Sequence, residues 1–136
     1  MLIGWRKAKK WKCVRCGLCC IKYTVRLTPQ EAIYLSKVVP IEQDEKGFIL
    51  KRAGVPCPFL EYSVMGARCK IYFEKPWVCR AFPFIVCKHP KYGDEKEALY
   101  TYKGRNYYVY VQSDCLGVGR GTSIASILPK IIKLYY

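Results

Sequence analysis

Alternation of apolar and polar residues predicts short strands along much of the chain. Tyr23, Val25 and Leu27 alternate with polar neighbours, which is typical of a half-buried strand over residues 23–27. Residues 48–52 predict a second strand that ends before Gly54. Two β-hairpins are also predicted: strands 60–64 and 67–72 with a turn at Met65-Gly66, and strands 99–102 and 107–111 joined by residues 103–106.

One helix has a clear start signal. Thr28 is a good N-cap, Pro29 suits the first helical position, and Glu31 completes a capping box. Apolar residues then recur at roughly helical spacing up to Pro40, so we predict a helix from Pro29 to Val38. It is interpreted as scaffold.

A second helix is predicted near the C-terminal end. Thr122 or Ser123 can cap a helix that runs through Leu128, with Pro129 bending or ending it. Polar stretches predict loops at 41–47 and 88–97, and the proline-rich stretch at 72–84 predicts a rigid loop or a short helical turn.

These elements predict one small α+β domain of short antiparallel hairpins and two or three helices around a cysteine-rich metal region. We expect residues 1–12 to form a basic N-terminal arm and residues 13–136 to form the single metal-binding domain. Tryptophans alternate with lysines in the arm, so its rings either stack on nucleic-acid bases or, as we favour, pack on the domain.

Nine cysteines set the chemistry, and four of them fall within Cys13–Cys20. No apolar run approaches the roughly 20 residues needed to span a bilayer, and no secretory signal is evident, so we expect a cytoplasmic protein. In a reducing compartment, clustered cysteines are metal ligands or redox groups more often than disulfides. We therefore predict eight metal ligands: Cys13, Cys16, Cys19, Cys20, Cys57, Cys69, Cys79 and Cys115.

The spacing favours an iron–sulfur cluster over zinc. Cys13, Cys16 and Cys19 repeat the C-x2-C spacing, and Cys57 precedes a proline, as in bacterial cluster-binding sequences. A closed zinc site accepts the same ligands. Because the side chains of adjacent residues tend to diverge, we expect Cys19 and Cys20 to serve different metals, unless one of them bridges.

Other candidate residues carry weaker signals. Cys87 lies in an apolar run and is interpreted as a small hydrophobic residue, and His89, the single histidine, as a surface residue. The glycine-rich segment after Cys115 does not fit a nucleotide-binding motif. We expect Gly117, Gly119 and Arg120 to support the metal ligand from outside its coordination shell.

The formal net charge is +14, from 24 lysines and arginines against 10 acidic residues. Metal-bound thiolates would lower this value, yet the protein would remain basic. Such a charge suits an acidic protein, nucleic acid or membrane surface as a partner, or it serves only solubility and compensation of an anionic metal centre.

The spaced motifs resemble the CxxCxxCC family, also called YkgJ-like, of zinc- or iron-chelating proteins. The matching residues are Cys13-x2-Cys16-Gly17-x-Cys19-Cys20, Leu27-Thr28-x2-Glu31-Ala32, Cys57-Pro58-Phe59-Leu60, Cys69-x-Ile71-Tyr72, Pro76-x2-Cys79-Arg80-x-Phe82-Pro83 and Cys115 before its glycines. The resemblance implies metal binding at these eight cysteines. Cys87 lies outside the pattern.

Three functions are compatible with these residues. The first is a metal–thiolate protein, holding an iron–sulfur cluster or zinc, with a redox or accessory role. The second is a zinc-stabilised binding module for nucleic acid or an acidic protein. The third is an enzyme that uses a cluster to modify a protein or small molecule, although no catalytic residues can be assigned.

Overall fold

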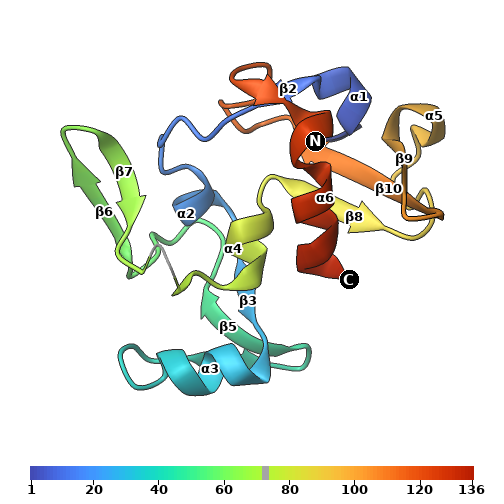
Figure 1. Ribbon diagram of the computed structural model, residues 1–136. Helices are drawn as coiled ribbons and strands as arrows, with labels where there is room; N and C mark the ends of the chain where they lie inside the picture. The colour runs from blue at the N-terminus through green and yellow to red at the C-terminus, as the bar shows by residue number, and fades with distance from the viewer. Residues whose placement is uncertain (72–73) are drawn as a thin grey trace. The chain divides into compact units, whose positions relative to one another are not determined.

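The structure, a computed structural model, describes residues 1–71 and 74–136 and consists of short helices and small antiparallel sheets (Figure 1). The predicted fold class, a small α+β protein of short hairpins, is confirmed. Two compact units divide the chain: unit 1 is Met1–Val14 with Ala81–Tyr136, and unit 2 is Arg15–Arg80. Our boundary between an arm at 1–12 and a domain at 13–136 stays a prediction.

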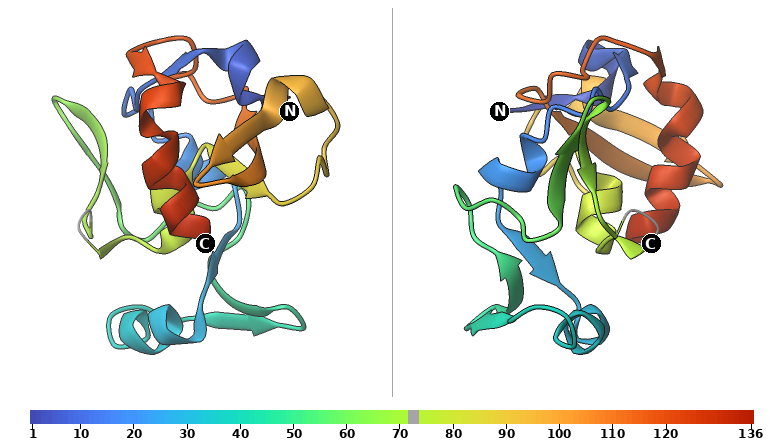
Figure 2. Two further views of the ribbon diagram at one scale, coloured as in Figure 1. Left: turned by 45° about the vertical axis from the view of Figure 1, so that its right-hand side comes forward. Right: turned by 90° about the vertical axis from the view of Figure 1, so that its left-hand side faces the viewer.

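Unit 1 is built on an antiparallel sheet in the order β1-β10-β8, with β9 also paired to β10 (Figures 1 and 2). Its strands are β1 (Leu2–Gly4), β2 (Lys10–Trp11), β8 (Phe84–Cys87), β9 (Leu99–Tyr102), β10 (Arg105–Gln112) and β11 (Thr122–Ser123). Its helices are α1 (Trp5–Ala8), α5 (Glu95–Ala98) and α6 (Ile124–Tyr135).

The core of unit 1 forms where one face of this sheet packs against one face of α6. Val109 and Val111 of β10 are fully buried, and they pair with Val86 and Phe84 of β8. The buried face of α6 packs against them through Ile124, Leu128, Ile131 and Ile132. Trp5 is 8% exposed in the same cluster, which confirms that this ring packs on the protein. Unit 1 therefore has an ordinary hydrophobic core.

The structure corrects three expectations in unit 1. Pro129 lies inside α6 and does not end it, because the residues beyond it are buried on the sheet. The hairpin of β9 and β10 turns through Lys103-Gly104, both with positive φ, so its loop has two residues and not four. A one-turn helix, α5, begins within the predicted loop at 88–97.

Unit 2 contains a three-stranded antiparallel sheet in the order β3-β5-β4 and a separate hairpin, β6–β7. Its strands are β3 (Val25–Leu27), β4 (Glu42–Asp44), β5 (Gly47–Lys51), β6 (Leu60–Ser63) and β7 (Gly66–Cys69). Its helices are α2 (Cys19–Lys22), α3 (Pro29–Leu35) and α4 (Trp77–Ala81). The predicted strands at 23–27 and 48–52 are confirmed as β3 and β5. Of the predicted loop at 72–84, Tyr72 and Phe73 lie outside the described residues, as does the predicted strand end at Tyr72.

The capping box of α3 is confirmed, because Glu31 N–H donates to Thr28 Oγ1 at 3.2 Å and Thr28 N–H donates to Glu31 Oε1 at 3.0 Å. The helix ends at Leu35, earlier than the predicted Val38. Val38 is 69% exposed, so no buried face continues the helix to that residue.

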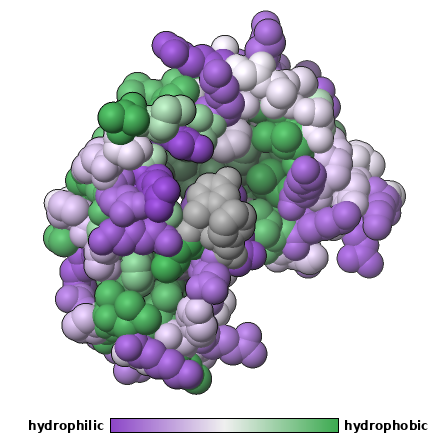
Figure 3. All heavy atoms as spheres, turned by 60° about the vertical axis from the view of Figure 1, so that its left-hand side comes forward, coloured by the Kyte–Doolittle hydropathy of each residue, from purple (hydrophilic) through white to green (hydrophobic). Residues whose placement is uncertain are grey.

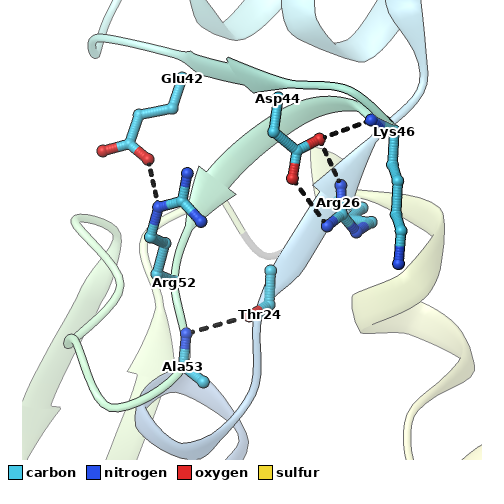
Figure 4. A network of polar contacts seen from close by, with 7 residues as sticks. All are labelled: Thr24, Arg26, Glu42, Asp44, Lys46, Arg52 and Ala53. Carbon is cyan, nitrogen blue, oxygen red and sulfur yellow. Dashed lines mark hydrogen bonds and ion pairs between the residues drawn. The ribbon is translucent and has the colours of Figure 1, made fainter.

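Polar side chains order part of the predicted loop at 41–47 as the edge strand β4 (Figure 4). The Arg26 guanidinium donates two hydrogen bonds to the Asp44 carboxylate, at 3.1 and 3.0 Å. This hydrogen-bonded guanidinium lowers the pKa of Asp44 to about 2. Arg52 also contacts Glu42 at 2.8 Å, so the end of β5 is fixed to β4.

The β6–β7 hairpin is confirmed with a shift of one residue in its turn. Ser63 pairs with Gly66, which makes Val64-Met65 the turn in place of Met65-Gly66. A Cβ on Gly66 would lie 2.9 Å from the Arg15 carbonyl oxygen. The tight approach of residue 15 therefore requires glycine as the first residue of β7.

Hydrophilic side chains are spread over the face seen in Figure 3, with hydrophobic side chains among them. Val64 and Met65 at the β6–β7 turn are the most exposed of the apolar residues in this hairpin. Within the described ranges, no helix has the length and apolar character required to cross a membrane.

Candidate metal centre

A turn at Gly17 leads into the helix that carries Cys19 and Cys20. Gly17 has φ +77°, and its carbonyl accepts the Cys20 N–H at 3.1 Å. A Cβ at Gly17 would lie 2.9 Å from the Ala67 Cβ of β7. Glycine is therefore required both by the backbone conformation and by the hairpin beside it. This turn starts α2, which carries Cys19 and Cys20.

Backbone hydrogen bonds place Cys57 next to α2. The Cys57 N–H donates to the Cys20 carbonyl at 2.8 Å, and the Gly54 N–H donates to the Ile21 carbonyl at 2.8 Å. The segment that follows β5 is thereby fixed along α2. Residues that are 37 positions apart in the sequence, Cys20 and Cys57, are direct backbone neighbours.

Two further elements bring Cys69 and Cys79. Cys69 is the last residue of β7 and pairs with Leu60, and Cys79 lies in α4. The capping residue Glu31 also fixes α4, because its Oε2 accepts the Trp77 N–H at 2.8 Å. One carboxylate therefore caps α3 and holds the start of the helix that carries Cys79.

Five cysteines form what we call the unit 2 cysteine cluster: Cys19, Cys20, Cys57, Cys69 and Cys79. Each is half-buried. Three of them, Cys57, Cys69 and Cys79, pack against the small hydrophobic core that includes Phe59 and Leu35. The cluster therefore lies at the edge of an apolar core, where charged thiolates are poorly solvated.

Burial and mutual proximity change the acidity of these thiols. Burial, together with the neighbouring Cys57, Cys19 and Cys69 thiolates, raises the pKa of Cys79 to about 12. Burial likewise raises the pKa of Cys57. The cluster therefore disfavours several thiolates together unless a cation compensates their charge, which is the condition that a bound metal satisfies.

The adjacent pair behaves differently from our expectation. A hydrogen bond joins the two thiols; it raises the pKa of Cys19 and lowers that of Cys20. The two side chains therefore do not diverge, and that expectation is wrong. Their assignment to different metals stays a prediction.

A buried lysine, which the sequence pattern does not predict, lies beside the cluster. Lys51, at the end of β5, is 4% exposed, and its Nζ donates to the Ile21 carbonyl at 2.7 Å. Burial lowers the pKa of Lys51, whereas the nearby Cys57 and Cys20 thiolates raise it. Lys51 therefore contributes a positive charge to a group of potential anions.

The cluster has the donor chemistry of a metal site without a closed shell of ligands. Among residues 1–71 and 74–136, no three histidine, cysteine or acidic side chains are arranged so that they could hold a metal ion. The soft thiolate donors nevertheless suit zinc or an iron–sulfur centre. Side-chain rotation of the clustered cysteines would be needed to complete either.

The remaining predicted ligands are spread over both units. Cys16 of unit 2 and Cys13 of unit 1 are exposed. Cys115 of unit 1 is half-buried, and its Sγ accepts a hydrogen bond from Trp11 Nε1 at 3.3 Å. Cys87 ends β8 and is half-buried, and burial raises its pKa. Its place in the sheet agrees with its interpretation as a packed residue. His89 is exposed.

The glycine-rich segment packs on the chain that precedes Cys13. A Cβ at Gly117 would lie 1.8 Å from the Lys12 carbonyl oxygen, so only glycine fits there. The Gly119 N–H donates to the Lys10 carbonyl at 2.8 Å, and the Arg120 N–H donates to the Gly117 carbonyl at 3.2 Å. The role of Gly117, Gly119 and Arg120 in support of Cys115 stays a prediction.

The fold and the clustered thiols define a small, cysteine-rich α+β protein with the donors of a metal-chelating domain. Residues 12–116 match the family described as "CxxCxxCC: Putative zinc- or iron-chelating domain". The match covers most of the chain and includes all nine cysteines. The chain belongs to this family, as its resemblance indicated.

One relative is a protein of Methanocaldococcus jannaschii named "Uncharacterized protein MJ0661". It is 32% identical over 87 residues, which cover 56% of this chain and 46% of the relative. The chain thus spans about half the length of this curated relative. No solved structure matches the chain.

Proposed function

We propose that the unit 2 cysteine cluster binds a metal centre through thiolates. The observation that carries this proposal is the convergence of five half-buried cysteines from α2, the segment after β5, β7 and α4. Without a metal, these groups are held as protonated thiols, because several thiolates at the edge of an apolar core would repel one another and be poorly solvated. With a metal, the same groups are a chelating set.

An iron–sulfur centre is the first candidate occupant and zinc is the second. The repeated C-x2-C spacing and the Cys57-Pro58 pair favour iron–sulfur. Adjacent Cys19 and Cys20 suit a centre with more than one metal, because a cluster or a metal pair can use neighbouring sulfurs. Lys51 would reduce the net negative charge of either occupant and so strengthen its binding.

The full proposed ligand set is the eight cysteines of the family pattern. Cys19, Cys20, Cys57, Cys69 and Cys79 supply the five that lie together in unit 2. Family membership supports the three others, Cys13, Cys16 and Cys115, as further ligands. Cys87 is excluded from the set.

A redox or accessory role follows for an iron–sulfur occupant, because a buried cluster carries electrons without a catalytic side chain of its own. The alternative of a binding module is less well supported at the N-terminal arm. Trp5 is buried, so its ring is not available to stack on a base, and Trp11 is partly buried against the unit 1 core. Lys7 also pairs with Asp94 at 3.2 Å.

The proposal is tested by elemental analysis and a visible absorption spectrum of protein that has been purified without oxygen. Iron with labile sulfide and a broad visible band would assign the cluster, and colourless protein with zinc would assign a structural site. Cys57→Ser and Cys79→Ser should lower the metal content, whereas Cys87→Ser is the matched control and should not. Protein that carries no metal, and binds neither zinc nor reconstituted iron and sulfide, would contradict the proposal.

A further inference from the structure

Unit 1 contains a cavity of about 380 Å³ that is half open to solvent and has no cysteine in its lining. It lies at the tip of the β9–β10 hairpin, beside the last turn of α6, two elements that can be followed in Figures 1 and 2. Its volume falls within the range of small-molecule sites, roughly 300–1,000 Å³. The cavity is therefore large enough for a ligand of moderate size.

The lining combines aromatic rings with positive charges. Six of its residues form two groups: the tyrosines Tyr102, Tyr107 and Tyr136, and the cations Lys103, Arg105 and Lys133. The buried residue Ile132 also contributes to the wall. Among the described residues that line the cavity, none is acidic. The lining thus suits a ligand that is both planar and anionic.

Strand register explains why these hairpin residues meet. Tyr102 of β9 pairs with Arg105 of β10, and Tyr100 pairs with Tyr107 two residues further along. Alternate residues of a strand share one face, so these four side chains lie on the same face of the hairpin. The two-residue turn adds Lys103 at the tip.

Helix spacing supplies the opposite wall. Ile132 of α6 and Tyr136, the C-cap residue of this helix, are four residues apart, so they lie one above the other. Lys133 is next to this row. The Tyr136 ring lies 5.6 Å from the Tyr107 ring, with an interplanar angle of 31°. The helix and the hairpin therefore present rings to the same space.

Lysine ammonium groups lie close to two of these tyrosine rings. Lys103 Nζ lies 5.4 Å from the centre of the Tyr102 ring, and Lys88 Nζ lies 4.7 Å from the centre of the Tyr136 ring. The carboxylate of Asp94 in the same unit pairs with Lys7, which is not part of the cavity. Cations that are grouped in this way create a positive potential that attracts an anion.

We propose that this cavity binds a nucleotide unit, a nucleobase that carries a phosphate. The phosphate would interact with Lys103, Arg105 and Lys133, with the arginine able to donate two hydrogen bonds to it. The base would stack against the exposed edge or face of the tyrosine rings. A free mononucleotide and a residue of single-stranded nucleic acid offer the same chemistry, so the experiment distinguishes these two sources.

The test measures binding of three probes by the full chain at low salt: adenosine monophosphate, a labelled single-stranded hexanucleotide, and inorganic phosphate. Arg105→Glu and Lys133→Glu reverse charges in the cavity, and Tyr102→Leu removes a ring but keeps apolar volume. Lys130→Glu is the matched control, because it makes the same charge change at an exposed position of α6 that does not line the cavity. Circular dichroism of each variant verifies that it is folded.

We expect Arg105→Glu and Lys133→Glu to weaken nucleotide binding about tenfold or more, and Lys130→Glu to change it by less than about twofold. Tyr102→Leu should weaken binding of the base-bearing probes but not of inorganic phosphate. Comparable binding of the mononucleotide and the hexanucleotide would indicate a free nucleotide, and binding of the hexanucleotide alone would indicate a strand. Both results support the proposal.

Three results would overturn it. The first is the absence of binding of either base-bearing probe at low salt. The second is an equal loss of affinity in Lys130→Glu and the cavity variants, which would mean that net charge and not the cavity attracts the probe. The third is equal affinity for phosphate and mononucleotide with no effect of Tyr102→Leu, which would mean that the cavity binds a bare anion.

Discussion

The two units of this protein are stabilised by different chemistry. Unit 1 has a core of large apolar side chains, among them Phe84, Ile124 and Leu128, all less than 2% exposed. The core of unit 2 is smaller, and cysteines pack along its edge where a larger protein would place aliphatic residues. Small domains with small cores commonly depend on metals or disulfides. We therefore expect unit 1 to fold by hydrophobic burial and unit 2 to depend on the metal that we propose for its cysteine cluster.

Loss of a clustered cysteine should have the largest effect on this comparison. Cys57→Ser or Cys79→Ser removes a proposed ligand, and we expect metal affinity to fall by a factor of about 100 or more. Equilibrium metal competition against a chromogenic chelator measures this change. The control Cys87→Ser should retain the affinity of the unchanged protein. An equal loss of metal affinity in all three variants would contradict the assignment of Cys57 and Cys79, and not Cys87, as ligands.

A core substitution in unit 1 should lower the stability of that unit without changing metal binding. Leu128→Ala leaves a cavity beside the sheet, and we expect it to lower the free energy of unfolding of unit 1 by about 2–5 kcal/mol. Metal content should not change. Chemical denaturation monitored by tryptophan fluorescence, together with elemental analysis, checks both. A variant that lost its metal as well would show that unit 2 is not independent of this core.

Loss of the buried charge tests the electrostatics of the metal site. Lys51→Met keeps the apolar stem and removes the cation, so we expect about a tenfold decrease in metal affinity. Lys70→Met removes the same charge from an exposed residue next to Cys69 and serves as the control. If both variants bind metal equally well, the position of Lys51 makes no contribution.

Alkaline pH should weaken unit 1 through a buried tyrosine. Burial raises the pKa of Tyr135 to about 12, and its hydroxyl donates to the Phe84 carbonyl at 2.7 Å. The tyrosine of the unfolded chain loses its proton near pH 10, so the unfolded state is favoured progressively as pH rises from about 10 to about 12. We expect a loss of about 1–2 kcal/mol, reduced by partial exposure. Denaturation at several pH values should show this loss, and Tyr135→Phe should not.

The smallest expected effect concerns the cap that links α3 and α4. Thr28→Ala removes the hydroxyl that accepts the Glu31 N–H and should cost about 1 kcal/mol. Glu31→Gln tests the second link, because its neutral side chain accepts the Trp77 N–H more weakly. Thermal melts measure both variants. An unchanged melting temperature in each would show that the cap does not stabilise unit 2.

Sequence predicts the elements of this protein where the signal is local. The Thr28–Glu31 capping box and the β6–β7 hairpin depend on neighbouring residues, and both are confirmed. Long-range packing decides the remaining cases. Pro129 does not end its helix, because buried residues beyond it continue α6. The pairing of Ser63 with Gly66 shifts the β6–β7 turn by one residue, and the local sequence does not reveal this register.

The candidate site shows the same limit. Cysteine spacing predicts eight metal ligands, but it does not reveal which of them lie together in unit 2, namely Cys19, Cys20, Cys57, Cys69 and Cys79. Lys51 is missed because a lysine in a short strand normally points to water, and only the surrounding fold makes it buried. The second oxygen of Glu31 binds a residue 46 positions away, which no local motif indicates.

Hydrogen exchange with and without metal tests the central claim most directly. Mass spectrometry would follow backbone amides of residues 15–80 and of residues 1–14 with 81–136, before and after chelation under reducing conditions. Our account predicts that metal removal lowers protection in unit 2 by up to about a thousandfold and leaves the core strands of unit 1 protected. Unchanged protection of unit 2, or equal loss in both units, would contradict it.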